Sequence, residues 1–316
     1  MARVATCVAW SAAAGLVALS DTRAVIRAVL FDLDNTLVFE DEATFQALRR
    51  ACAFAGERAG LEPDVLYERV VAAAERNWRS SPVYAYAERM GIWWGEGLWA
   101  EFAGPQAMLR ALRSFALRFR ERTWREALLA VGVSDDSLAA ELAERYRDVR
   151  RATRLVDPES DKVLADLARD HRLALVTNGA PDVQREKLAG TTLARHFAAI
   201  VISCEVGVAK PDPRIFRLAL ARIGASAAES VMIGDSLARD VAGAKAAGMR
   251  AIWIDRGLWG DEKAPPPDAR IAALSAVRSA LDALEPRAAS PRGSRGPRPA
   301  TARGASRARA SRKAGR

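Results

Sequence analysis

Short apolar runs that end in polar or glycine residues constrain the fold of this chain more than any other feature. The first run covers residues 25–31 and leads directly into Asp32-Leu33-Asp34. Similar runs recur at 173–177, 199–203, 231–233 and 251–254. Continuous apolar and β-branched character, without polar alternation, is typical of strands that are buried on both faces of a parallel sheet.

Helical segments separate the later runs, at 161–169, 183–188, 213–223 and 238–247. Strands that alternate with helices predict βαβ units. We therefore expect an α/β fold class with a doubly wound, mostly parallel sheet. Ligands bind such sheets beyond the carboxyl ends of the strands, which is where the polar residues after each run would lie.

Residues 41–153 follow a different pattern, because helical spacing continues through them without any strand signal. This predicts an all-helical domain inserted between the first strand and the rest of the sheet. The segment contains five of the eight tryptophans, namely Trp78, Trp93, Trp94, Trp99 and Trp124. Most of them are expected in a core. Trp93 and Trp94 are the exception, since adjacent residues on a helix cannot both face one core.

The net charge of +9 comes from the C-terminal end of the chain. Residues 286–316 hold ten Lys and Arg and no acid, and the remainder has 38 basic against 39 acidic residues. This tail is expected to be disordered, because it lacks large apolar side chains. A nucleic-acid contact is expected only through the tail, since a folded nucleic-acid-binding domain carries basic charge on its own face.

Several other classes are excluded by composition. Three cysteines without CxxC spacing form neither a disulfide framework nor a common zinc site, and they favour a cytoplasmic location. Two histidines leave little room for a His-based metal centre. No run approaches the roughly 20 apolar residues of a membrane span, so no membrane partner is expected. Residues 1–24 are interpreted as an N-terminal extension, with a secretory signal or an over-long start as the open alternatives.

Polar residues after four of the strands form a constellation that predicts phosphoryl transfer. Asp32 and Asp34 follow the first strand, and a hard divalent cation would relieve the repulsion of such carboxylates. The other members are Thr177-Asn178-Gly179, Lys210-Pro211, Gly234-Asp235 and Asp240. Four acids, a hydroxyl and a lysine at one sheet edge suit a metal and a phosphate group.

These segments resemble, in order and spacing, the four motifs of the haloacid dehalogenase (HAD) superfamily of hydrolases. The resemblance covers residues 25–284, and the helical insert resembles the type-1 cap of that superfamily. Residues 177–188 are similar to the subgroup of N-acylneuraminate-9-phosphatase and the pyrimidine 5′-nucleotidases. The resemblance implies a Rossmann-like core at 25–40 and 154–285, a cap at 41–153 and separate ends at 1–24 and 286–316.

The same resemblance implies roles for individual residues. Asp32 would be the nucleophile, and Asp34 the general acid and base. Asp32, Asp34 (through its main-chain carbonyl) and Asp235 would bind Mg²⁺, with Asp240 as a supporting acid. Thr177, Asn178 and Lys210 would bind the phosphate of the substrate. Gln184 and Lys187, on the next helix, are expected to be structural or solvated.

The predicted function is a Mg²⁺-dependent phosphatase that hydrolyses a small-metabolite phosphate monoester through an aspartyl-phosphate. One alternative is a haloacid dehalogenase on the same fold. Asp34 weighs against it, because displacement of a halide needs no acid for the leaving group. The other alternative is a catalytically silent binding protein, although every motif acid is intact. The sequence does not indicate the oligomeric state.

Overall fold

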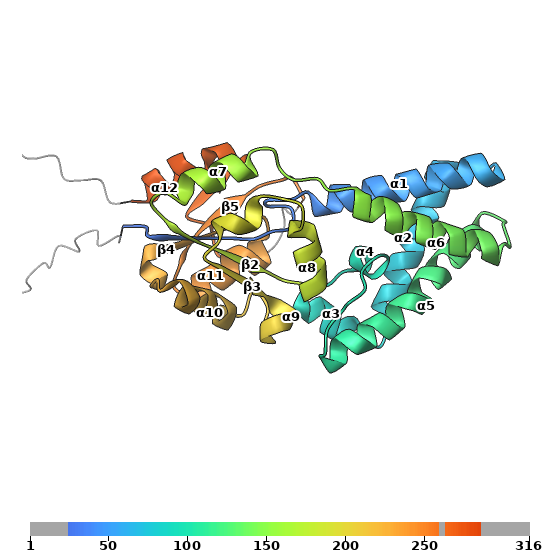
Figure 1. The fold of residues 1–316 in the computed structure, drawn as a ribbon, viewed down its shortest axis with the longest axis horizontal. Coiled ribbons are helices and arrows are strands. Elements are labelled where there is room, and N and C mark those ends of the chain that lie inside the picture. The colour runs from blue at the N-terminus through green and yellow to red at the C-terminus, as the bar shows by residue number, and fades with distance from the viewer. Residues whose placement is uncertain (1–24, 259–262, 286–316) are drawn as a thin grey trace, which may run out of the picture. The chain divides into compact units, whose positions relative to one another are not determined.

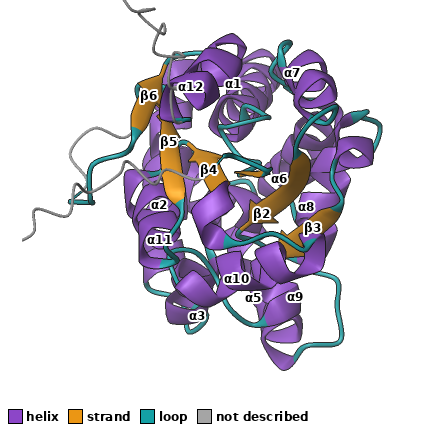
Figure 2. Cartoon of the chain, turned by 90° about the vertical axis from the view of Figure 1, so that its left-hand side faces the viewer, coloured by secondary structure: helices purple, strands orange, loops and turns teal. Residues whose placement is uncertain are grey.

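Six parallel strands form one sheet with the order β3-β2-β1-β4-β5-β6 (Figure 2). The computed structural model describes residues 25–258 and 263–285, so the predictions for 1–24 and 286–316 lie outside the described residues. The strands are β1 (Ala28–Phe31), β2 (Arg172–Thr177), β3 (Ala199–Ile202), β4 (Ser230–Gly234), β5 (Arg250–Ile254) and β6 (Ala269–Ile271). All five predicted runs contain a strand, and the α/β fold class is confirmed.

Alternate residues of the central strands pack on opposite faces of the sheet. Val29 and Phe31 of β1 lie in one cluster with α7 (Ser160–Leu167) and α12 (Val277–Leu284), which cover that face (Figure 1). Leu30 lies in the other cluster, with α10 (Pro213–Ile223) and α11 (Ala242–Ala246). Burial on both faces explains why these strands read as unbroken apolar runs.

The regular structure described between β1 and β2 is helical, as predicted, apart from two isolated bridges that Val38 forms with Asp34 and with Val156 (Figure 1). Six helices lie between Glu40 and Ala152: α1 (Glu40–Ala59), α2 (Pro63–Arg79), α3 (Tyr84–Met90), α4 (Trp94–Gly97), α5 (Ala107–Ala130) and α6 (Asp136–Ala152). Trp78, Trp99 and Trp124 are buried in their common core, so the helices form a cap with its own hydrophobic interior. The exact domain boundaries stay a prediction.

The chain enters and leaves the cap through two segments that lie side by side. Phe39 N donates to Leu155 O at 2.7 Å, and Val38 forms an antiparallel bridge with Val156. The two ends of the insertion are therefore hydrogen-bonded to each other at the edge of the core.

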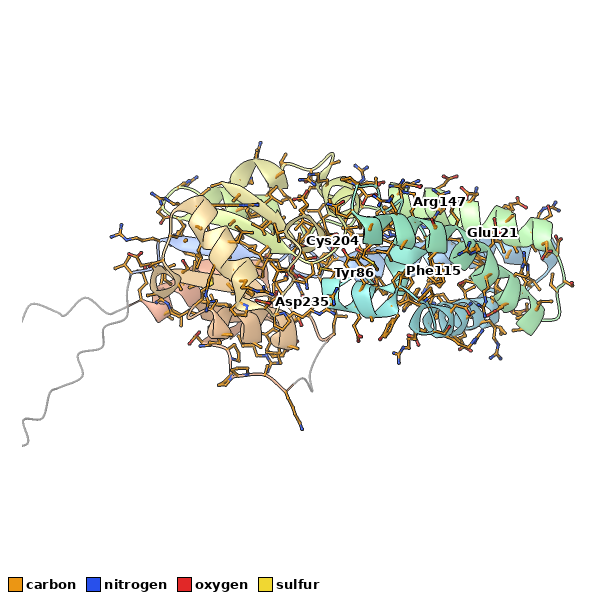
Figure 3. All side chains as sticks on the ribbon, turned by 90° about the horizontal axis from the view of Figure 1, so that it is seen from below. Tyr86, Phe115, Glu121, Arg147, Cys204 and Asp235 are labelled. Carbon is orange, nitrogen blue, oxygen red and sulfur yellow. The ribbon has the colours of Figure 1, made fainter. Side chains whose placement is uncertain are left out.

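A second contact between cap and core involves α3 and the helix α9 (Ser203–Val206), which follows β3. Ser203 Oγ donates to Met90 O at 2.9 Å. Tyr86 Oη donates to Cys204 Sγ at 3.6 Å, and Figure 3 shows these two side chains close together. Within residues 25–258 and 263–285, no helix has both the length and the hydrophobicity of a membrane span.

Candidate active site

The predicted motifs meet because their strands are neighbours in the sheet. β1 lies between β2 and β4, and Phe31 is level with Leu175 and Ile233. Asp32 N donates to Ile233 O at 2.9 Å, which extends this register by one residue. The loops that follow the three strands therefore begin at the same edge, where the strand order changes direction, as ligand sites in such sheets do.

Three carboxylates gather at this edge. Oxygen atoms of Asp32, Asp235 and Asp240 all lie within 4.8 Å of one another, and all three residues are buried. Carboxylate oxygens in this arrangement suit a hard divalent cation such as Mg²⁺. The sequence predicts only a supporting role for Asp240, whereas in the structure its carboxylate is itself one of the three that form the cluster.

Local backbone structure brings Asp240 to the cluster. A π-helical turn at Leu237–Val241 follows β4, a conformation that is frequent at functional sites. Ser236 caps this turn by accepting from Arg239 N. A Cβ on Gly234 would lie only 2.2 Å from Asp240 Oδ2, so glycine makes room for the carboxylate.

Lys210 neutralises part of this negative charge. Its ammonium is buried, 2.5 Å from Asp32 Oδ1 and 2.7 Å from Asp240 Oδ1. The pKa of Asp32 is raised to about 7, chiefly by burial. Lys210 opposes this rise, and Asp240 and Asp34 contribute to it. One lysine thus faces several carboxylates, and a bound cation would supply the charge that is missing.

The carboxylate of Asp34 is held by the helix α8 (Pro181–Leu188), which follows β2. Lys187 Nζ lies 2.9 Å from Asp34 Oδ1 and 3.1 Å from Oδ2. Gln184 Nε2 donates to Asp34 Oδ2 at 2.9 Å and to Thr177 Oγ1 at 2.6 Å. We expected both side chains to be structural or solvated; they are buried and not solvated, and they touch two motif residues.

Two further acids share Lys187, and sequence reasoning missed both. Glu96 of the cap lies 2.8 Å from Lys187 Nζ, and Glu40 lies 3.3 Å from it. Arg150 also pairs with Glu40. Gln184 and Lys187 lie three residues apart, on one face of the helix after Thr177. That spacing was the available signal, but nothing in the sequence indicated which acids the face meets.

The predicted phosphate-binding residues occupy different positions. Thr177 is fully buried, and it is not among the residues that line the cavity of the site. The Asn178 side chain binds the main chain of Lys210, donating to its carbonyl at 3.0 Å and accepting from its N–H at 2.9 Å. Asn178 and Lys210 both line the cavity. The amide of Asn178 therefore fixes the loop that carries Lys210.

The cavity has a volume of about 460 Å³ and lies between core and cap. The core contributes Asp32, Asp34 and Asp235 to its wall, and the cap contributes Trp93 and Trp94. Trp93 is extended and precedes α4, and the ring centroids of the two tryptophans are 4.9 Å apart. Trp94 belongs to the buried core of the cap and Trp93 packs against the same core, so the exception expected for this pair is wrong. Trp93 precedes the helix instead of lying on it, which lets both neighbours pack there while they also line the cavity.

A carboxylate cluster with a buried lysine, at the carboxyl edge of a parallel sheet and under a helical cap, defines the class of capped α/β hydrolases. Residues 26–248 match the family described as haloacid dehalogenase-like hydrolase. The chain belongs to this family, and it is a phosphoric monoester hydrolase within it.

Known relatives agree with this placement. The chain is 43% identical to phosphoserine phosphatase of Thermus thermophilus, over 80% of this chain and 98% of that protein. It is 25% identical to N-acylneuraminate-9-phosphatase of Homo sapiens, over 82% of this chain and 95% of that protein. The fold is shared with the HAD-hydrolase YfnB of Bacillus subtilis, with a TM-score of 0.57 and 22% identity over 82% of this chain and 100% of that one.

Proposed function

We propose that this enzyme is a Mg²⁺-dependent phosphatase that hydrolyses the phosphate monoester of a small metabolite through an aspartyl-phosphate on Asp32. The observation that carries this proposal is the cluster of Asp32, Asp235 and Asp240, in which Lys210 pairs with Asp32 and Asp240. Asp32, Asp235 and Lys210 line the cavity. Mg²⁺ held by these carboxylates and by the main-chain carbonyl of Asp34 would offset the charge of the substrate phosphate.

In the first step, an Asp32 oxygen attacks phosphorus and the bond from phosphorus to the ester oxygen breaks. Asp34 gives its proton to that oxygen, so the alcohol leaves neutral. In the second step, Asp34 takes a proton from water, the water oxygen attacks phosphorus, and inorganic phosphate leaves Asp32. Lys210, with contacts from the Thr177 and Asn178 segment, stabilises the oxygens of the phosphoryl group.

One relative and the cavity wall support a choice of the first substrate to test. The phosphoserine phosphatase relative makes O-phosphoserine the first substrate to test. Beyond the motif acids, Asp41, Glu75 and Glu96 line the cavity, and within the described part of the chain Glu75 has no ion pair. An acidic wall suits a substrate whose leaving group carries an ammonium.

The dehalogenase alternative is weaker because two buried residues serve Asp34. Displacement of a halide needs no proton donor, whereas here Lys187 and Gln184 hold a carboxylate on the cavity wall. Hydrolysis of an alkyl phosphate does need a proton donor for the leaving group. A silent binding protein would have no reason to keep this arrangement, since burying several carboxylates costs stability.

The test is hydrolysis of O-phosphoserine and 4-nitrophenyl phosphate by the full chain, with Mg²⁺ and with EDTA. We expect activity with Mg²⁺, none with EDTA, and recovery when Mg²⁺ is restored. Brief incubation with substrate, acid quenching and mass spectrometry should show one phosphate on Asp32. Asp32→Asn should lose both the label and turnover. Full activity in EDTA, or a label at another residue, would refute the proposal.

A further inference from the structure

Lys187 joins the cap to the carboxylate of Asp34. It is buried, it approaches both oxygens of Asp34, and it also pairs with Glu96 on α4. Asp34 and Lys187 belong to the core, whereas Glu96 belongs to the cap. We propose that Lys187 is a positioning residue that orients the Asp34 carboxylate toward the leaving-group oxygen, and that Glu96 couples this orientation to contact between cap and core.

This inference rests on the proposed function, because it acts through Asp34 as the general acid. The geometry supports positioning more than simple charge balance. Contacts to both oxygens, with Gln184 as a second donor to Oδ2, fix the plane of the carboxylate as well as its place. Proton transfer depends steeply on the distance and alignment of donor and acceptor, so a fixed plane favours catalysis.

The cost of the arrangement argues that it serves more than folding. Asp34, Glu40 and Glu96 converge on one lysine, and among the described residues Glu96 Oε2 has no hydrogen-bond partner. A buried acceptor without a partner makes the folded state less stable than a satisfied one does. Apolar side chains of similar size would pack core and cap at lower cost.

Close packing of cap and core explains how Glu96 can exert this control. A Cβ on Gly91 of the cap would lie 2.5 Å from Asn178 Cβ of the core, so the two surfaces touch beside the cavity. The contact between Lys187 and Glu96 exists only in this closed arrangement. Separation of the surfaces would leave Lys187 shared by Asp34 and Glu40 alone, and the orientation of Asp34 would change.

The test compares phenyl phosphate with 4-nitrophenyl phosphate, which have similar shapes but leaving groups of different basicity. Phenolate needs protonation more than 4-nitrophenolate does, so loss of general-acid catalysis slows phenyl phosphate selectively. We expect Lys187→Met to lower kcat for phenyl phosphate by about 100-fold and for 4-nitrophenyl phosphate by less than about 10-fold. Glu96→Gln should show the same selectivity to a smaller degree.

Asp34→Asn separates failure of this inference from failure of the proposed function. If Asp34→Asn lowers kcat selectively for phenyl phosphate while Lys187→Met lowers kcat equally for both substrates, only the positioning role is refuted. No selectivity in Asp34→Asn would refute the general-acid role itself. Gln184→Leu provides a second route to the same readout if Lys187→Met fails to fold, and equal losses there would also overturn the inference.

Lys245→Met is the matched control. Lys245 pairs with Asp268 on the surface of the core and does not line the cavity. This variant should hydrolyse both substrates at the wild-type rate, and circular dichroism melts of all variants should report their folding.

Discussion

At the scale of single residues, the site is defined by charges that would be unstable apart. Lys210 is buried between Asp32 and Asp240, and each of these groups depends on the others for compensation. Burial alone lowers the pKa of the Lys210 ammonium, but Asp240 and Asp32 outweigh that effect, and the pKa is raised. The residue types and spacings predicted this meeting correctly, because adjacent parallel strands align their ends.

Replacement of Lys210 by Met should destabilise the fold by about 3–5 kcal/mol in EDTA, since it leaves buried carboxylates uncompensated. Excess Mg²⁺ should recover much of this loss, because the metal would take over the compensation. Urea unfolding of wild type and variant, each with EDTA and with Mg²⁺, measures the difference. The same substitution at Lys245 should cost about 1 kcal/mol or less. If Lys210→Met lowers the free energy of unfolding by the same amount in EDTA and in Mg²⁺, the expectation is contradicted.

Gly234→Ala should weaken metal binding while the fold persists. The added methyl group would approach Asp240 Oδ2 to 2.2 Å and displace the carboxylate from the cluster. We expect the Mg²⁺ concentration for half-maximal activity to rise by about 10–100-fold, as for other losses of support to a metal ligand. A titration of activity against Mg²⁺ tests this, and an unchanged midpoint would show that Asp240 is not needed for metal binding.

At the scale of elements, prediction succeeded where burial leaves a continuous signal. The five apolar runs became strands, but β6 was missed, because Ala-Arg-Ile at the edge of the sheet has only one buried residue and no apolar run. The helix at α8 was expected, whereas the contacts of Lys187 were not. Its partner Glu96 comes from the cap, and the packing of an insertion against a core has no local sequence signal.

The link between α4 and α8 predicts a pH dependence of stability. The pKa of Glu96 is raised to about 7, chiefly by burial. Lys187 opposes this rise, and Asp34 and Glu40 contribute to it. The folded protein therefore holds this proton more tightly than the unfolded chain. The resulting stabilisation is complete below about pH 4.5 and is lost as the pH rises through about 7.

Glu96→Gln should remove this dependence. Relative to the variant, the free energy of unfolding of the wild type should fall between about pH 4.5 and 7, and denaturant titrations at several pH values would show it. The matched control is Glu121→Gln on the exposed side of α5, labelled in Figure 3. The control should run parallel to wild type, and a Glu96→Gln curve that also runs parallel would contradict the expectation.

At the scale of the whole molecule, net charge conceals where the chemistry lies. The value of +9 arises from ten basic residues within 286–316, whereas the site depends on a few acids in a nearly neutral body. The fold class followed from local patterns, and so did the meeting of Asp32, Asp235, Asp240 and Lys210 at one edge of the sheet. The roles of these residues stay predictions. The support from Gln184, Lys187, Glu40 and Glu96 did not follow from local patterns, because it depends on how distant segments meet.

A chain that ends at Glu285 should keep its phosphatase activity and lose affinity for polyanions. The full chain should bind heparin or duplex DNA at low salt, with affinity that falls steeply as salt is added. The shortened chain carries 38 basic and 39 acidic residues and should bind neither. Fluorescence anisotropy with labelled DNA measures both proteins side by side. Equal affinity would place the binding surface within residues 1–285.

The paired crossings at Val38–Val156 and Phe39–Leu155 have a consequence for how such enzymes diversify. Because entry and exit are already hydrogen-bonded neighbours, a short turn could close the core where more than a hundred residues now intervene. The cap is therefore an insertion that could be exchanged without opening the core. A core of this kind could act on different substrates after its cap is replaced, while the core residues that break the phosphate ester stay in place.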